Sequence, residues 1–215
     1  MKILNFAFIT LLLCQLFTNC KKGEDDPLLS LRTRKARVVG EWKIKSGTEN
    51  YNTSSTGNNA SANSISTSYT DARYSSTTTY SDSAGNAFSD NYTGSVSYTM
   101  EFKKNGEFFS EMITDNQSRI TQKGTWNFTA GIGTHKNKEQ IVIHLDSYVS
   151  QYLNPIGGGG YVGGGYSTFS KGSSTDLTYT IKELRNKKIV LTSEKNTSDN
   201  SGYEYSLISE FTFEQ

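Results

Sequence analysis

Hydrophobic and polar residues alternate along much of the second half of the chain, with the period of two that is typical of half-buried β-strands. Residues 96–102 show this alternation, Asn105 and Gly106 provide a turn, and Phe108 and Phe109 begin a returning strand. The pattern leaves open whether the turn contains a bulge, and therefore which of the two phenylalanines faces inward. We expect this segment to form a β-hairpin.

The same alternation predicts further strands toward the C-terminus. Three segments place large apolar residues or glycine on one face, namely Gly124, Trp126 and Phe128, then Ile141, Ile143 and Leu145, and last Tyr203, Tyr205, Leu207, Phe211 and Phe213. Residues 177–194 predict a second hairpin that turns near Asn186. Together these signals indicate eight or nine strands.

One short helix is expected before the first strand. Asp26 followed by Pro27 is a typical helix start, and Gly40 is expected to end the helix. A basic cluster lies near the C-terminal end of this helix: Arg32, Arg34, Lys35 and Arg37. The cluster either contacts a phosphate or membrane surface or, as we favour, forms a solvated side of the helix.

Two segments lack a clear core pattern. Residues 46–95 are rich in Ser, Thr, Asn and Tyr and are compatible with either long exposed strands or loops. Residues 154–174 contain the run GGGGYVGGG. Neither a Gly-Lys-Ser/Thr motif nor a helix follows this run, so we reject a phosphate-binding loop and expect a mobile loop at one mouth of a barrel.

The predicted fold class is all-β. A sheet of this size must protect its edges, and closure into an antiparallel up-and-down β-barrel protects them most completely. We therefore expect a barrel of eight to nine strands preceded by one short helix, with a two-sheet sandwich as the alternative.

The N-terminus has the features of an export signal. Residues 1–19 begin with the positively charged Lys2 and continue as an apolar run that is too short for a membrane span. Cys20 follows, and Cys14 would be lost with the signal peptide, which leaves Cys20 without an intrachain disulfide partner. We therefore expect Cys20 to be lipidated and residues 20–26 to form a charged tether.

The stretch LFTNC, which ends at Cys20, resembles the lipobox of bacterial lipoproteins. Asn19 and Phe17 depart from the usual lipobox residues, and the looser pattern is similar to that of lipoproteins of the Bacteroidota. In those proteins an acidic cluster soon after the cysteine often accompanies export to the cell surface, and CKKGEDDP is similar. The resemblance implies a protein that is lipid-anchored at the outer membrane.

Several motifs in order resemble the lipocalin-like lipoprotein domains of Bacteroidota: Gly40 and Trp42 in GEW, the hairpin FKKNGEFF, and Gly124 and Trp126 in GTW. The resemblance covers residues 27–215. In lipocalins a Gly-x-Trp opens the first strand, and its Trp closes the barrel floor beneath a late-strand arginine. Trp42 matches, whereas the last strand here contains no arginine. The resemblance implies the fold and leaves the function open.

Charge and candidate chemistry narrow the function. Removal of residues 1–19 leaves 21 basic and 21 acidic residues, and this balance argues against nucleic-acid binding. The two histidines are His135 and His144, and His144 shares an outward strand face with Asp146. Strand carboxylates, Glu101, Glu107, Glu111 and Asp146, belong to ordinary polar faces. We therefore expect no metal site, no cofactor and no enzymatic activity.

Two functions remain. The first is a structural or accessory lipoprotein that contacts a protein partner at the outer membrane through residues 46–95 and 154–174, because loops on a rigid scaffold commonly carry binding. The second is a lipocalin-type carrier with a small apolar or amphipathic ligand in the barrel. A glycan is a further candidate partner. Asp82-Ser83-Ala84 resembles the O-glycosylation sites of Bacteroidota, with Ser83 as the acceptor.

Overall fold

The computed structural model describes residues 33–56, 61–130, 139–152, 164–168, 176–200 and 202–215. These residues form one short helix, α2 (Arg34–Val38), and an 11-stranded antiparallel sheet. The strands are β1 (Gly40–Ser55), β2 (Ser61–Thr70), β3 (Arg73–Ser81), β4 (Ala87–Phe102), β5 (Glu107–Thr114), β6 (Ser118–Ala130), β7 (Glu139–Tyr152), β8 (Gly164–Thr168), β9 (Leu177–Leu184), β10 (Lys188–Ser198) and β11 (Tyr203–Glu214).

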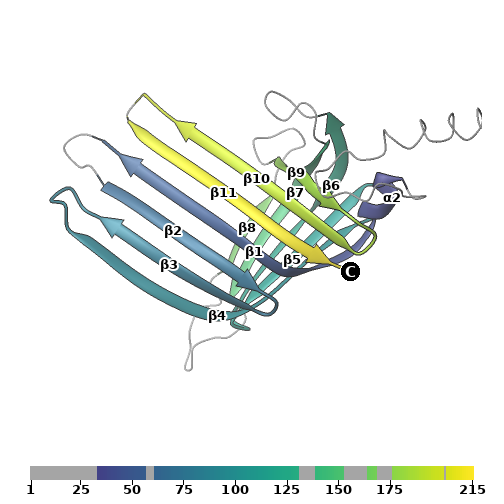
Figure 1. Ribbon diagram of the computed structural model, residues 1–215, viewed down its shortest axis with the longest axis horizontal. Coiled ribbons are helices and arrows are strands. Elements are labelled where there is room, and N and C mark those ends of the chain that lie inside the picture. Colours follow the sequence, from purple (N-terminus) through teal and green to yellow (C-terminus); the bar gives the residue numbers. More distant parts are fainter. Residues whose placement is uncertain (1–32, 57–60, 131–138, 153–163, 169–175, 201) are drawn as a thin grey trace, which may run out of the picture.

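The sheet closes into an antiparallel β-barrel, which confirms the predicted fold class (Figure 1). Its strands follow the order β6-β5-β4-β3-β2-β1-β11-β10-β9-β7-β8, and pairing between β6 and β7 closes the wall. Ten strands form the wall, because β8 pairs with β7 alone. The number exceeds eight or nine because residues 46–95, which were compatible with loops, form strands.

The barrel has a narrow end and a wide end. At the narrow end β1 pairs directly with β4, from Gly40 with Phe102 to Lys43 with Thr99, so that β2 and β3 are excluded from the ring. Further along, β2 and β3 lie between β1 and β4.

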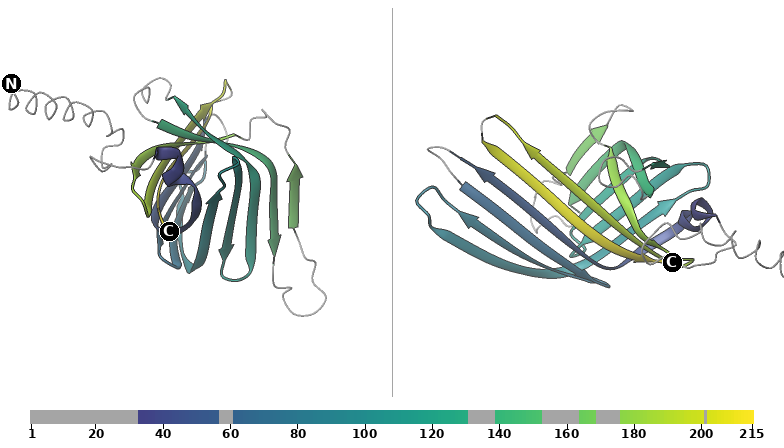
Figure 2. Two further views of the ribbon diagram at one scale, coloured as in Figure 1. Left: turned by 90° about the vertical axis from the view of Figure 1, so that its right-hand side faces the viewer. Right: turned by 45° about the horizontal axis from the view of Figure 1, so that its top comes forward.

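Six strands then continue past the rest of the wall as a long sheet, which we call the extension (Figures 1 and 2). It consists of residues 47–55, 61–70, 73–81, 87–95, 193–198 and 203–209.

The narrow end is filled by the protein's own side chains. Its largest fully buried residues are Trp42, Met100, Phe102, Ile141, Ile143, Ile181, Leu184, Ile189, Leu191 and Phe213. Both tryptophans are buried, which the alternating pattern predicted for Trp126 and the resemblance to lipocalins implied for Trp42. Trp42 Nε1 donates a hydrogen bond to the Val38 carbonyl at 2.7 Å, and Trp126 Nε1 donates one to the Lys103 carbonyl at 3.0 Å. Because both indole N–H groups are satisfied, the rings can pack without a desolvation cost.

The hairpin of β4 and β5 resolves the alternative that the sequence left open. Phe102 pairs with Phe108, and their ring centroids lie 5.3 Å apart inside the barrel. The Gly106 N–H donates to the Lys103 carbonyl at 3.0 Å, and Gly106 has a φ of 91°. This turn therefore directs Phe108, and not Phe109, into the core.

The favoured interpretation of the basic cluster is wrong for two of its residues. Arg37 is buried, and its Nη1 donates a hydrogen bond to the Leu184 carbonyl at the end of β9. Arg34 forms an ion pair with Glu139 at the start of β7. Both contacts form because α2 lies at the narrow end of the barrel, close to these strand ends (Figure 2). Arg34 and Arg37 therefore fix the helix to the barrel.

The helix also ends earlier than expected. Val39 already has an extended backbone, and Gly40 opens β1 instead of ending the helix. The φ of Gly40 is 142°, a backbone conformation that side chains disfavour, so glycine suits this position because of its conformational freedom. The expected helix start at Asp26 and Pro27 lies outside the described residues.

The glycine-rich segment is only partly described. Within it, Gly164–Thr168 forms β8 and pairs with residues 147–151 of β7, which corrects the expectation of a loop over these five residues. Thr and Tyr favour strand structure, and they follow the last glycines directly. The rest of the segment, 154–163 and 169–174, lies outside the described residues.

We predict that Trp42→Ala and Trp126→Ala each lower the free energy of unfolding by about 3–5 kcal/mol, because each leaves a large cavity in the packed end. Chemical denaturation followed by circular dichroism measures this change. Tyr152→Ala is the control, since Tyr152 is 59% exposed. Losses below about 1 kcal/mol at both tryptophans would contradict the prediction.

Candidate functional site

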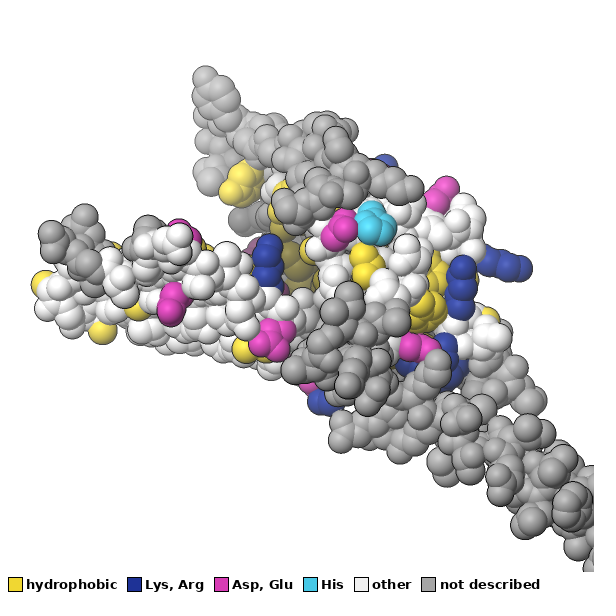
Figure 3. Space-filling model, turned by 90° about the horizontal axis from the view of Figure 1, so that it is seen from above, with side chains coloured by type: hydrophobic (Ala, Val, Ile, Leu, Met, Phe, Trp, Pro, Cys, Tyr) yellow, Lys and Arg dark blue, Asp and Glu magenta, His cyan; other side chains and the backbone are white. Residues whose placement is uncertain are grey.

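A cavity of about 220 Å³ lies between the packed narrow end and the extension. Its lining includes a carboxylate, Glu49, and four tyrosines, Tyr69, Tyr98, Tyr148 and Tyr179. The rest of the wall is both apolar and polar: Met112, Ile120, Leu177, Leu207 and Phe211, with Ser110, Gln122, Ser193 and Ser209. Seen from above, hydrophobic side chains are visible in the hollow between the extension and the remaining strands (Figure 3). The cavity therefore combines apolar and aromatic side chains with hydroxyl and amide groups, and Glu49 contributes the one carboxyl group among its lining residues.

Glu49 faces inward because of a local irregularity in β1. The register between β1 and β11 shifts between Ile44 and Ser46, after which Gly47, Glu49 and Tyr51 point to the inside. Gly47 provides room for a core ring, since a Cβ there would lie 2.5 Å from Phe211 Cδ1. The carboxylate is therefore brought directly above the aromatic core.

The environment of Glu49 disfavours its charge. Burial raises the pKa of this carboxyl above its usual range. Glu49 pairs with Ser209 on β11 and with Thr67 on β2, and the Thr67 hydroxyl donates to Ser76 Oγ at 3.0 Å. Within the part of the chain that the structure describes, the Glu49 carboxylate forms no salt bridge and accepts no hydrogen bond. The cavity thus holds a carboxylate without a counter-charge.

The tyrosines around Glu49 remain protonated at neutral pH. Burial, with a smaller contribution from the charge of Glu49, raises the pKa of Tyr179 to about 12 and that of Tyr69 further. Burial also raises the pKa of Tyr98 well above its usual range, and Tyr98 is hydrogen-bonded to Tyr179. These hydroxyls therefore serve as hydrogen-bond donors and the rings as electron-rich faces.

The inner face of the extension continues this aromatic lining. Its aromatic residues are Tyr51, Tyr69, Tyr74, Tyr80, Phe88, Tyr92, Tyr203 and Tyr205, and the strand register places them on one face. Their rings form a chain of contacts, with centroid distances of 5.5 Å for Tyr51–Tyr205 and 5.7 Å for Tyr74–Tyr92. Toward the tip the rings become exposed, to 61% at Phe88 and 55% at Tyr92. The extension thus presents an open aromatic surface.

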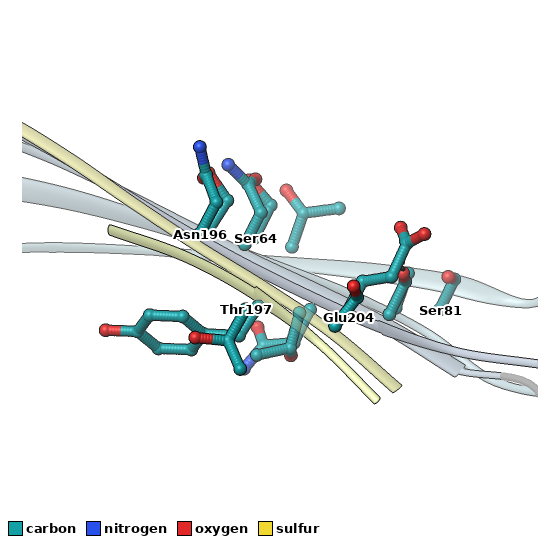
Figure 4. A pocket seen from close by; sticks show the side chains of 14 residues that line it. Ser64, Ser81, Asn196, Thr197 and Glu204 are labelled. Atoms are coloured by element: carbon teal, nitrogen blue, oxygen red, sulfur yellow. Dashed lines mark hydrogen bonds between the residues drawn. The ribbon is translucent and has the colours of Figure 1, made fainter. Parts of the chain in front are cut away.

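The outer face of the extension has a different character. It consists mainly of Ser, Thr and Asn side chains, some of which form cross-strand hydrogen bonds such as Ser66 to Asn50 at 2.8 Å and Thr77 to Asn91 at 2.7 Å. A space of about 570 Å³ near the tip is lined from both faces, with Asn196 and Ser64 on one side of the strands and Thr197 on the other (Figure 4). Because its lining spans both sides of the sheet, this space is not an enclosed site.

Both long edges of the extension are free within the described strands. β10 pairs with β9 only as far as Thr192, and β4 pairs with β5 only from Val96 onward. Residues 193–198 and 87–94 therefore expose backbone N–H and C=O groups along these edges, which are a template for pairing with another strand.

Asp115 attaches the extension to the barrel wall. It lies in the turn between β5 and β6 with a φ of 53°, and its carboxylate accepts hydrogen bonds from the hydroxyls of Tyr74 at 2.9 Å and Tyr92 at 2.8 Å. The Ser95 N–H also donates to it at 2.8 Å. These bonds, the one from Tyr92 first, lower the pKa of Asp115. One turn thus connects β3, β4 and β5.

The residues singled out in the sequence lie apart from this cavity. Gly40, Trp42, Gly124 and Trp126 belong to the packed narrow end, where Gly124 allows a close approach to the His144 carbonyl. Cys20 and His135 lie outside the described residues. The sequence reasoning missed Glu49 and the tyrosines around it. The signal that could have found them is the spacing of Gly47, Glu49 and Tyr51.

Two other candidates have clear positions. His144 points outward, as expected, and its Nδ1 lies 2.8 Å from an Asp176 carboxylate oxygen. Ser83 is exposed in the turn between β3 and β4 at the tip of the extension, where Asp82 accepts hydrogen bonds from Ala84 and Asn86. In the described ranges we find no set of three His, Cys, Asp or Glu residues placed to hold a metal ion, and no helix with the length and apolarity that crossing a membrane requires.

Comparisons with known proteins add little. No family model and no curated protein matches this chain. The chain is similar to the crystal structure of Rv2717c from M. tuberculosis, with 9% sequence identity and a TM-score of 0.24, and the match covers 86% of this chain and 99% of the other. At this TM-score the similarity carries no argument, so the function must be inferred from the geometry.

We predict that Asp115→Ala loosens the extension, because it removes the acceptor for Tyr74, Tyr92 and Ser95. Hydrogen exchange should become faster in residues 73–81 and 87–95 and remain unchanged in β6 and β7.

Since the pKa of Asp115 is lowered in the folded state, the wild-type contact should be complete above the unfolded pKa of about 3.9. It should be lost as the pH falls through the lower folded value. Asp90→Ala, an exposed carboxylate on β4, is the control, and equal exchange in both variants would contradict the prediction.

Proposed function

We propose that this chain is a non-enzymatic lipoprotein of the outer membrane that acts by contact with a protein partner. The observation that carries the proposal is the extension, whose aromatic inner face and free β4 edge lie side by side at residues 87–95. Exposed Tyr and Phe side chains are common anchors at protein interfaces. Free strand edges add main-chain hydrogen bonds to such anchors when a partner contributes a strand.

The backbone of β4 is oriented for this pairing. The Val96 N–H donates to the Ala72 carbonyl on the β3 side at 2.8 Å, whereas the Ser95 carbonyl accepts from the Asp115 N–H on the β5 side at 2.9 Å. Backbone groups alternate sides along a strand, and the register between β3 and β4 is unbroken over residues 87–95. The N–H and C=O groups of Ser89, Asn91 and Thr93 therefore point away from the sheet.

The two edges differ in how they are protected. The β10 edge carries Glu194 and Lys195 next to each other, and charged side chains discourage unwanted strand pairing. The β4 edge carries one charge, Asp90, between the exposed rings of Phe88 and Tyr92. We therefore assign the partner contact to the β4 edge.

Cys20 supplies the second part of the proposal. The resemblance of residues 16–20 to a lipobox and the charged residues 21–26 support an N-terminal lipid anchor with a short tether. Such an anchor would hold the extension close to partners in the same membrane and raise their effective concentration. Surface display would in addition make a glycan partner accessible to the aromatic face.

The carrier function is less well supported for a large ligand. The narrow end is packed with the protein's own aromatic residues, and the cavity of about 220 Å³ is smaller than the roughly 300–1,000 Å³ of typical drug-sized sites. An apolar or amphipathic ligand in this cavity would therefore have to be small.

We predict that Cys20→Ser abolishes membrane attachment of the processed protein, because no acyl chain can then be added. Fractionation of cells that express the variant should yield an unprocessed precursor or a soluble form, and metabolic labelling with a fatty acid should label the wild type alone. A Cys20→Ser protein that is processed and remains in the membrane fraction would contradict this prediction.

We predict that Thr93→Pro weakens partner binding by about tenfold or more, because proline removes one outward N–H from the β4 edge. Thr93→Ala is the matched control, since it keeps the N–H and removes the side chain. In-cell crosslinking, followed by purification and quantification of the recovered outer-membrane protein, measures the effect, and circular dichroism verifies the fold.

Equal recovery with Thr93→Pro and Thr93→Ala would contradict the assignment to the β4 edge. Recovery of a bound glycan or small molecule in place of a protein would contradict the contact function itself.

A further inference from the structure

The cavity wall contains a carboxyl group that no basic side chain of the described residues pairs with. The Glu49 carboxyl lies on the cavity wall, and within the described residues no Lys, Arg or His pairs with it. Burying a carboxylate away from water without a counter-charge costs free energy. Proteins usually compensate such a group with a nearby cation or by protonating it. A positively charged ligand would provide the missing charge.

The surroundings of Glu49 suit one kind of cation. Tyr69, Tyr98 and Tyr179 line the same cavity, and their rings present electron-rich faces. Aromatic faces next to a carboxylate are the usual environment for an ammonium group in a binding site. A divalent metal is a poorer fit, because no set of three metal-ligating side chains exists among the described residues.

The apolar part of the wall specifies the rest of the ligand. Leu177, Leu207 and Met112 line the cavity together with the polar groups. They would contact a short hydrocarbon or aromatic group attached to the ammonium. We propose that this cavity binds a small organic cation, an ammonium group on a short apolar body, whose charge pairs with Glu49 and lies against the tyrosine rings.

The same face of the sheet already contains one ammonium–tyrosine contact. Lys195 Nζ lies 6.0 Å from the centroid of the Tyr205 ring, on the inner face of β10 and β11. Lys195 pairs with Leu207, which is two residues nearer the tip than Ser209, the partner of Glu49. The Lys195 ammonium group thus contacts the Tyr205 ring, nearer the tip of the extension, and does not pair with the Glu49 carboxylate.

The ligand has a route to the site. The inner face passes without interruption from Glu49 to Tyr51 along β1 and from Ser209 to Tyr205 along β11. Figure 3 shows a hollow between the extension and the remaining strands. The site is separate from the β4 edge assigned to the partner. Its occupation therefore does not depend on the contact function, and either proposal can fail without the other.

The experiment uses two probes of similar size on the full-length, folded protein. 2-Phenylethylamine is cationic at neutral pH, and 2-phenylethanol is its neutral counterpart. Isothermal titration calorimetry and the intrinsic tyrosine fluorescence should both report saturable binding of the amine. The alcohol should bind at least about tenfold more weakly, since it cannot pair with the carboxylate.

Three variants then assign the effect to the carboxylate. Glu49→Gln keeps the shape of the side chain and should weaken amine binding by at least about tenfold while leaving alcohol binding unchanged. Glu204→Gln, which removes an exposed carboxylate from the outer face of β11, should bind the amine like the wild type. Lys195→Ala should not weaken amine binding. Denaturation curves verify that all three variants are folded, and Glu49→Gln should leave capture of the outer-membrane partner unchanged.

Several results would overturn the proposal. Equal binding of amine and alcohol would show a purely apolar cavity. Unchanged amine binding in Glu49→Gln would remove the carboxylate from the site. The absence of saturable binding of either probe up to about 10 mM, above the millimolar range of weak complexes, would exclude a site of this class.

Discussion

The direct pairing of β1 with β4 at the narrow end is the constraint on which the rest of the structure depends. Four residue pairs, from Gly40 with Phe102 to Lys43 with Thr99, bring the wall to its smallest circumference. At that circumference the side chains of Trp42, Phe102 and Phe213 fill the interior completely. Once β1 leaves β4 and takes β2 as its neighbour, the wall widens, and the same inward alternation produces a cavity and then an open surface.

This change in width explains why one sequence pattern serves three purposes. Inward residues of β11 are Phe213 and Phe211 in the core, Ser209 and Leu207 at the cavity, and Tyr205 and Tyr203 on the extension. The inward side chains become more polar toward the tip, where they are more exposed to water. This order is expected, because burying a polar group without a partner costs free energy. Tyrosine suits the transition, because its ring packs against apolar neighbours and its hydroxyl meets water or a ligand.

The parts of the fold that could be read from the sequence are those where one face is apolar and the other polar. Ile141, Ile143 and Leu145 share one face of their strand and are buried, and the hairpin around Asn105 forms as expected. Residues 46–95 show no such contrast, because tyrosine alternates with Ser and Thr. Pairing with neighbouring strands, more than local propensity, determines the strands in this region. The burial of Arg37 was equally inaccessible, because it depends on where a helix meets strand ends more than a hundred residues away. In the sequence Glu49 does not differ from other polar strand residues. Its inward position depends on the register shift after Ile44, which the sequence does not indicate.

The closure of the barrel also determines the order in which the protein can fold. β2 and β3 pair with near neighbours in the chain, whereas β1 pairs with β11 through contacts such as Lys43 with Glu214, which join the start of the domain to its end. Contacts of such high sequence separation form slowly, because a long loop must close before they contribute. Until the final strand has been synthesised, one edge of β1 has no partner and the aromatic core stays open. The unfinished chain therefore exposes aggregation-prone surface throughout its synthesis, and nearly complete truncation products share that exposure.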